Sequence, residues 1–187
     1  SNESFNEESI IENQILENSC INCHTFRQND PDNFLIHMRG PRDGTYFIDG
    51  GKITRSNLKI ESNPNGAAYP SWHPDGKLIA FSSNQVRQSF YAQPDKSIEV
   101  YDQSSALILF DKETNEIIKI TESDTISYFD TFPAWSQDGK YLYFCRTKRD
   151  RSLINPTAYD IKSTFYSLVR KPFYNESKSF GETEILI

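Results

Sequence analysis

Hydrophobic and polar residues alternate over short stretches along most of the chain, and two of these stretches are copies of one another. Residues 69–82 align without gaps with residues 132–145, 63 positions further on. Each copy reads [Tyr/Phe]-Pro-x-Trp-x-x-Asp-Gly-Lys and continues into an alternating run. Glycine accepts the positive φ that a tight turn requires, so each copy predicts a β-hairpin that turns at Asp-Gly.

Further alternating stretches predict the remaining strands around these hairpins. They are residues 106–111 and 116–121 after the first copy, 163–170 and 183–187 after the second, and the pair 44–49 and 52–59 before both. A repeat of this kind indicates stacked units. We expect an all-β protein, a partial β-propeller of about two and a half four-stranded blades over residues 41–187. Closed propellers have about four to eight blades, so this part is expected to be a fragment of a longer propeller.

The first 40 residues lack the propeller pattern, and we expect residues 1–40 to form a short helical segment. Ile11 and Ile15 are spaced i, i+4 in the Glu-rich stretch 4–18, which predicts an amphipathic helix. Pro31 begins the stretch 31–38, which predicts a second, short helical turn because proline favours the first turn of a helix.

The repeat resembles the TolB-like, WD-type β-propeller repeat. The whole arrangement, with a Cys-Ile-Asn-Cys-His motif at residues 20–24 upstream of the repeats, is similar to a group of exported Bacteroidetes proteins that are longer than this chain. The resemblance implies a periplasmic, outer-membrane-associated or extracellular protein, with its signal segment not present in this chain. It also implies a propeller that binds an envelope protein, a peptide or a glycan.

The motif Cys20-x-x-Cys23-His24 has the form used to attach a c-type haem. Two thiols add to the two vinyl groups of the porphyrin, and the adjacent histidine becomes the proximal iron ligand. His37 is the first candidate for a sixth ligand, and Met38 is the second. We therefore predict a possible haem c cofactor held by these five residues.

Two other uses of the cysteines remain open. Cys20 and Cys23 are close enough in sequence to form a local disulfide in an oxidising compartment. They are also half of a zinc site that His24 and Cys145 would complete. The leading hypothesis is a cell-envelope binding or scaffold propeller with a haem for electron transfer, and the alternative is a non-redox binding platform whose cysteine pair is structural.

Composition narrows the partners and the chemistry. The net charge of −6 and the pI near 5.1 argue against nucleic acid as a partner. No stretch is apolar enough over about 20 residues to span a bilayer. Hydrolase and phosphate-binding motifs are missing from the sequence, so we expect no enzyme activity.

Two inserts, 84–105 and 148–162, are longer than ordinary hairpin connections, and long loops often carry binding residues. The candidates for partner contact in these inserts are Arg87, Phe90, Tyr91, Arg149, Arg151 and Tyr159. Open sheet edges also suggest self-association.

Overall fold

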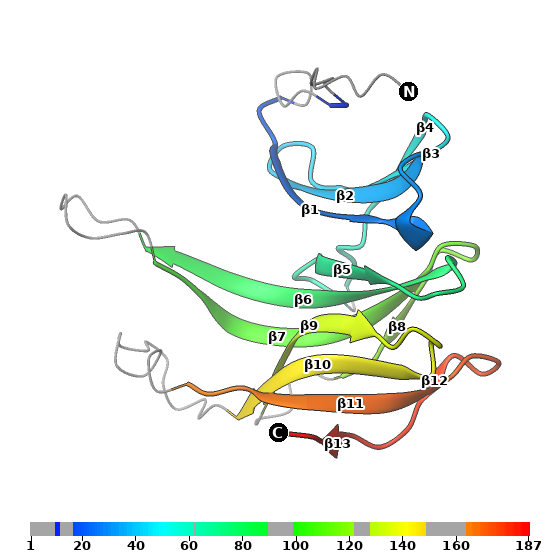
Figure 1. Cartoon of the computed structure of the whole chain (residues 1–187). Coiled ribbons are helices and arrows are strands. Elements are labelled where there is room, and N and C mark those ends of the chain that lie inside the picture. The colour runs from blue at the N-terminus through cyan, green and yellow to red at the C-terminus, as the bar shows by residue number, and fades with distance from the viewer. Residues whose placement is uncertain (1–9, 12–16, 62, 90–98, 122–127, 149–163) are drawn as a thin grey trace, which may run out of the picture.

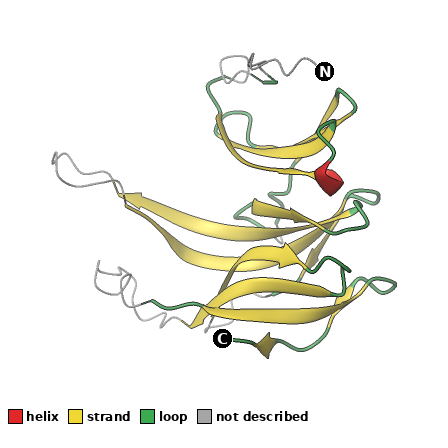
Figure 2. Cartoon of the chain, in the orientation of Figure 1, coloured by secondary structure: helices red, strands yellow, loops and turns green. Residues whose placement is uncertain are grey.

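Among the residues that the structure describes, nearly all regular structure is β-strand, with one turn of 3-10 helix at Arg27–Asn29 (Figure 2). A computed structural model describes residues 10–11, 17–61, 63–89, 99–121, 128–148 and 164–187. Within these residues no helix is long and apolar enough to cross a membrane.

The strands form three antiparallel sheets in chain order. The first sheet contains β1 (Cys20–Phe26), β2 (Asn33–Arg39), β3 (Gly44–Asp49) and β4 (Lys52–Ser56). The second contains β5 (Ala68–Trp72), β6 (Leu78–Ser89), β7 (Glu99–Asp111) and β8 (Glu116–Lys119). The third contains β9 (Tyr128–Trp135), β10 (Tyr141–Lys148), β11 (Ser167–Tyr174) and the short β12 (Ser179–Phe180) and β13 (Glu184–Ile185), which both pair with β11.

The three sheets pack face to face, with β1, β5 and β9 neighbouring one another (Figure 1). Two apolar layers fill the spaces between them. Phe47 of the first sheet and Phe81 and Phe110 of the second are fully buried in one layer. Leu107 of the second sheet and Phe144 of the third are fully buried in the other. The chain is thus an all-β partial β-propeller, in which each sheet is a blade and β1, β5 and β9 are the inner strands.

The structure contains three blades where two and a half were expected, because residues 20–39 complete the first blade. The predicted helical turn at 31–38 is wrong, since these residues form strand β2. Five consecutive residues of this strand, 34–38, are buried. A strand that is covered on both faces reads as a continuous apolar run, which sequence periodicity cannot distinguish from a buried helix. The expected boundary at residue 40 therefore falls inside a sheet, and most of the stretch 4–18 lies outside the described residues.

The predicted hairpins at Asp-Gly are confirmed, as are the strands at 44–49, 106–111 and 116–121. The first insert is shorter than expected because both strands continue into it. β6 pairs with β7 along its whole length, from the pair Leu78 and Asp111 to the pair Ser89 and Glu99. A two-stranded ribbon therefore projects beyond the blade (Figure 1).

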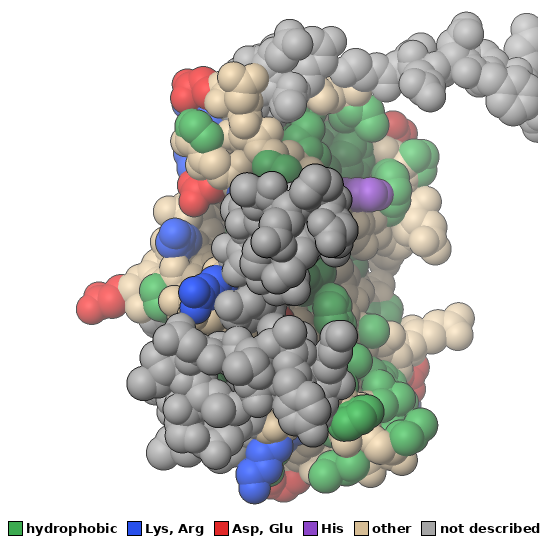
Figure 3. Space-filling model, turned by 90° about the vertical axis from the view of Figure 1, so that its left-hand side faces the viewer, with side chains coloured by type: hydrophobic (Ala, Val, Ile, Leu, Met, Phe, Trp, Pro, Cys, Tyr) green, Lys and Arg blue, Asp and Glu red, His purple; other side chains and the backbone are tan. Residues whose placement is uncertain are grey.

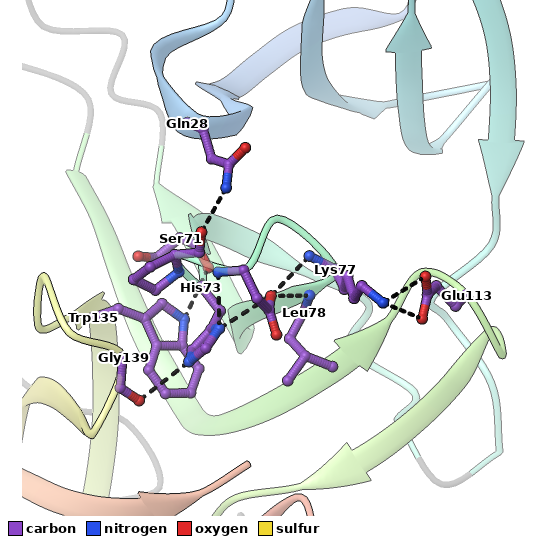
Figure 4. A network of polar contacts seen from close by, with 10 residues as sticks. Gln28, Ser71, His73, Lys77, Leu78, Glu113, Trp135 and Gly139 are labelled. Atoms are coloured by element: carbon purple, nitrogen blue, oxygen red, sulfur yellow. Dashed lines mark hydrogen bonds and ion pairs between the residues drawn. The ribbon is translucent and has the colours of Figure 1, made fainter. Parts of the chain in front are cut away.

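The second and third blades are each tied to the blade before them by a tryptophan at the end of the inner strand. The Nε1–H of Trp72 donates to the carbonyl of Thr25 in β1 over 3.3 Å. The Nε1–H of Trp135 donates in the same way to the carbonyl of Ser71 in β5 over 3.2 Å (Figure 4). The two tryptophans therefore act in blade-to-blade packing.

His73 has a structural role beside the second of these bonds. Its Nε2–H donates to the carbonyl of Gly139 over 3.1 Å, because a carbonyl oxygen only accepts (Figure 4). Its Nδ1 accepts from the backbone N–H of Asp75 at 3.2 Å. Its ring also lies edge-on to Trp135, with 4.7 Å between the ring centroids. His73 thus joins the Asp-Gly turns of the second and third blades.

Candidate binding site on the inner strands

The inner strand of each of the three blades is interrupted by an irregularity in strand pairing. The register shifts between Ile21 and His24 in β1 and between Ala68 and Ser71 in β5. In β9 it shifts between Thr131 and Ala134, which pair with Cys145 and Tyr143 of β10. Cys23, Tyr69 and Phe132 stand at these bulges. A β-bulge redirects a side chain out of the regular alternation, and bulges are common beside functional sites.

Tyr69 and Phe132 adopt an unusual backbone conformation at their bulges. Their φ angles are +48° and +56°. A left-handed conformation is strained for a bulky side chain, and a following proline disfavours it further. Both residues precede a proline, Pro70 and Pro133. Strain of about 1–3 kcal/mol per residue persists only where the surroundings fix it, and it is concentrated at functional sites.

The two strained aromatic rings contact each other across the second and third blades. Their centroids are 4.5 Å apart with an interplanar angle of 49°, and Tyr69 and Phe132 remain 37% and 51% exposed. Figure 3 shows hydrophobic side chains gathered along the right-hand side of that view, which is the side that faces the viewer in Figure 1. We call Tyr69 and Phe132 the aromatic pair.

Hydrogen bonds from both backbones hold the aromatic pair in place. The N–H of Tyr69 donates to the Cys23 thiol sulfur over 3.4 Å. The N–H of Phe132 donates to the Ser82 hydroxyl over 3.0 Å. Ser82 in turn lies 3.3 Å from the hydroxyl of Thr131, and both of these side chains are fully buried. Each strained bulge is thus held by a hydrogen bond to the blade before it.

Charged residues surround the phenol of the aromatic pair. Partial burial raises the pKa of the Tyr69 hydroxyl, the negative charge of Asp102 adds to this, and the positive charge of Arg39 opposes it. The hydroxyl is therefore neutral at physiological pH and remains able to donate a hydrogen bond.

A third exposed aromatic residue, Tyr128, lies at the start of β9. The guanidinium of Arg146 lies 4.6 Å from the ring centroid of Tyr128, which is 42% exposed. Arg146 is fixed by a two-pronged ion pair with the buried carboxylate of Asp130, at 2.7 and 2.8 Å. Such a guanidinium is rigid, so Tyr128 extends the aromatic surface of the inner strands without much loss of side-chain freedom on binding.

The structure does not bring the predicted haem residues to one point. The Cys23 sulfur faces Tyr69 of the second blade, whereas the ring of His24 lies 6.2 Å from that of Phe26. Phe26 packs at 5.4 Å on Phe34, on the opposite face of the first sheet. Attachment to β1 as folded would need two thiols and an imidazole on one side, and this strand does not provide that arrangement.

The two candidate sixth ligands also diverge. His37 is buried on the face of β2 that meets the second blade, with its Nδ1 3.2 Å from the hydroxyl of Thr45. Met38 is fully buried on the other face, among Phe34, Ile36, Tyr46 and Ile48. Cys20, Cys23 and Cys145 are free thiols, and the described residues contain no group of three or more His, Cys, Asp or Glu placed to hold a metal ion. Haem attachment stays a prediction from the motif alone.

The predicted loop residues are only partly placed. Arg87 is exposed on β6, opposite Tyr101 in the ribbon. The others lie outside the described residues, namely Phe90, Tyr91, Arg149, Arg151 and Tyr159. The aromatic pair was not predicted from the sequence, although an aromatic residue followed by proline at the same position of both repeats was its signal.

Comparison with protein-family models and with curated protein sequences found no match. The solved structures that resemble the chain include one described as a crystal structure of the tricorn protease. The similarity has a TM-score of 0.48 and 16% sequence identity, and it covers 89% of this chain but only 16% of that one.

Proposed function

We propose that this chain is a binding platform whose inner-strand face takes a protein or peptide partner. The observation that carries the proposal is the aromatic pair, two partly exposed rings held in strained conformations at equivalent positions of consecutive blades. Aromatic side chains on rigid supports are typical anchors of protein interfaces, because they bury large apolar areas at little entropic cost.

The surroundings favour a polypeptide over a purely apolar ligand. Tyr128 with its bound Arg146 extends the aromatic surface on β9, and the phenol of Tyr69 offers a hydrogen-bond donor beside it. A central apolar anchor with polar groups at its rim is the usual composition of a protein interface. Glycan binding is the alternative outcome. We also propose a cell-envelope location for the chain, as its resemblance to exported proteins implies.

The test is selection from a random-peptide display library against the whole chain, followed by affinity measurements on the selected peptides. Truncating an aromatic anchor costs about 2 kcal/mol, or about thirtyfold in Kd. We expect that loss for Tyr69→Ala and for Phe132→Ala. Tyr174→Ala is the matched control, because this tyrosine is 56% exposed on β11, outside the inner strands. Selected peptides that bind the two variants as tightly as the parent would contradict the proposal.

A further inference from the structure

A pocket of about 280 Å³ lies between the first and second blades and adjoins the aromatic pair along β5. Ala68 lines the pocket, and the next residue of β5 is Tyr69. The inner part of the pocket includes the buried side chains of His37 and Leu58, and its outer part includes the more exposed Arg39 and Lys59. A peptide on the aromatic pair therefore has this pocket beside it, at the start of β5.

Arg39 extends from β2 toward the second blade. Leu35 and His37 of the same strand face that blade, Leu35 in the apolar layer with Phe81 and His37 in the pocket. Side chains two residues apart on a strand share a face, so Arg39 faces the second blade as well. Burial lowers the pKa of His37 to about 4, and the positive charge of Arg39 adds to this; the same charge opposes the rise that burial causes in the pKa of Tyr69. The guanidinium thus acts on both the pocket and the aromatic pair.

Positive charge predominates in the lining of the pocket. Its cations are Arg39 and Lys59, and no ion pair to either is found in the described part of the chain. Its one carboxylate, that of Asp43, lies 3.5 Å from the guanidinium of Arg55. His37 is neutral at physiological pH, because its pKa is far below 7. A guanidinium binds a carboxylate with two parallel hydrogen bonds, so the pocket suits a carboxylate although the whole chain has a net charge of −6.

The connection between the first two blades forms a fixed wall of the pocket. The buried amide of Asn63 donates to the carbonyl of Leu58 over 2.6 Å and to that of Gly66 over 2.8 Å. Its side-chain oxygen accepts from the hydroxyl of Ser83 on β6. A wall braced in this way does not open to let a continuous chain pass, and the pocket is at the small end of those that take organic ligands. It therefore suits the end of a peptide better than its middle.

We propose that this pocket takes the C-terminal carboxylate of the peptide that binds on the aromatic pair. Arg39 and Lys59 are the partners of the carboxylate, and the preceding side chains of the peptide lie against the rings of Tyr69 and Phe132. The inference rests on the proposed function and deepens it, because it gives the bound peptide a direction. The free end of the peptide points to the first blade, and the rest of it extends toward the third.

Two forms of one peptide test the proposal, the tightest binder from a library displayed with free C-termini. One form ends in a carboxylate and the other in an amide, and each is titrated into the whole chain by isothermal calorimetry. We expect the amide to bind at least about tenfold more weakly, because it loses a charged hydrogen-bond acceptor. Equal affinities would overturn the inference. An affinity that depends on an internal Asp or Glu of the peptide, and not on its terminus, would overturn it too.

Variants assign the effect to the pocket. Arg39→Gln should weaken the carboxylate form about tenfold and leave the amide form unchanged, so that the difference between the two forms disappears. Arg42→Gln is the control, because Arg42 pairs with the exposed Glu17 at 2.6 Å and does not line the pocket. The difference should persist in this variant. Arg39→Gln with the full difference retained would contradict the assignment.

Substitutions in the aromatic pair separate failure of this inference from failure of the proposed function. Tyr69→Ala and Phe132→Ala should weaken both forms of the peptide by the same factor, since the rings contact its side chains and not its terminus. If they do so while the two forms bind equally, peptide binding stands and the terminus is wrongly placed. Peptides that bind both variants as tightly as the parent would contradict the proposed function and this inference with it.

Discussion

The imidazole of His73 lies directly against Gly139 of the next blade and donates to its carbonyl over 3.1 Å. A Cβ atom at residue 139 would collide with the ring of His73, and Gly139 has a φ of +71°. The hairpin turn of the third blade is thus shaped to receive a side chain of the second. The interface requires glycine for both space and conformation.

Gly139→Ala should therefore destabilise the chain by about 2 kcal/mol or more, the sum of left-handed strain and a steric clash. Gly50→Ala is the control, because Gly50 also has a positive φ, +54°, but a Cβ there meets nothing within 4 Å. That variant should lose only about 1 kcal/mol. Urea denaturation of both variants makes the comparison. Equal losses would show that His73 moves aside without cost.

Stability should fall as the pH drops from 6.5 towards about 4, because His37 has a folded-state pKa of about 4 against an ordinary value of 6.5. In this window the unfolded chain takes up a proton that the folded chain does not, so acid favours unfolding. The loss attributable to His37 is up to about 3 kcal/mol. His37→Gln should remove this part of the pH dependence, whereas His24→Gln, at an exposed site, should keep it. An unchanged profile for His37→Gln would refute the assignment.

Breaking the ion pair between Lys178 and Asp111 should lower the thermal midpoint by several degrees. Burial raises the pKa of Asp111, but the Lys178 ammonium and the backbone N–H groups of Glu113 and Thr114 lower it more, so the carboxylate is charged. Lys178→Met would leave this buried charge without its cation, which is costly.

Lys77→Met is the matched control for that experiment. Lys77 pairs with Glu113 at 3.0 Å, with both side chains more than half exposed. Exposed pairs contribute little to stability, so its midpoint should barely change. Differential scanning calorimetry of the two variants compares them. Similar midpoints would mean that the Asp111 pair is as weak as a surface pair.

Protein produced with haem-attachment machinery tests the prediction from the motif Cys20-x-x-Cys23-His24, which expects a covalent haem that survives denaturation. Intact mass and the visible spectrum provide the measurement, with a cytochrome matured in the same cells as a positive control. A covalent haem that disappears in Cys20→Ala, Cys23→Ala would establish the motif as functional and would show that β1 rearranges during maturation, because Cys23 and His24 face opposite sides of this strand. Colourless protein with no added mass would contradict haem attachment.

Local signals predicted much of the fold. Asp-Gly turns between alternating runs identified the hairpins of the second and third blades, because turn chemistry and side-chain alternation are properties of neighbouring residues. Strand β2 was missed, since burial of both of its faces depends on the second blade and on Ile11, which packs against the outer face. That β1 is the inner strand of the first blade could not be predicted either, because β1 lacks the Trp-x-x-Asp-Gly motif that marks the inner strands of the other two blades.

The sites were harder to predict than the strands. The pocket between the first and second blades is lined by residues 37–40, 43–44, 57–59, 65–68, 84 and 86, and it exists only where two blades meet. Strain at Tyr69 and Phe132 depends on backbone angles that residue types do not specify. Trp72 and Trp135 recur at the same position of the repeat, whereas His73 stands where the other copy has Ser136, so its contact with Gly139 had no repeated signal.

The tryptophan bonds between blades have a direction. Trp72 and Trp135 each donate to the blade before them, whereas Phe26, which ends β1 as these tryptophans end β5 and β9, has no N–H in its side chain. A blade grafted after the third would bring its own indole donor and require only a backbone carbonyl from this chain. A blade grafted before the first would face a phenyl ring with nothing to donate, so this indole bond can form only with a blade that follows the third.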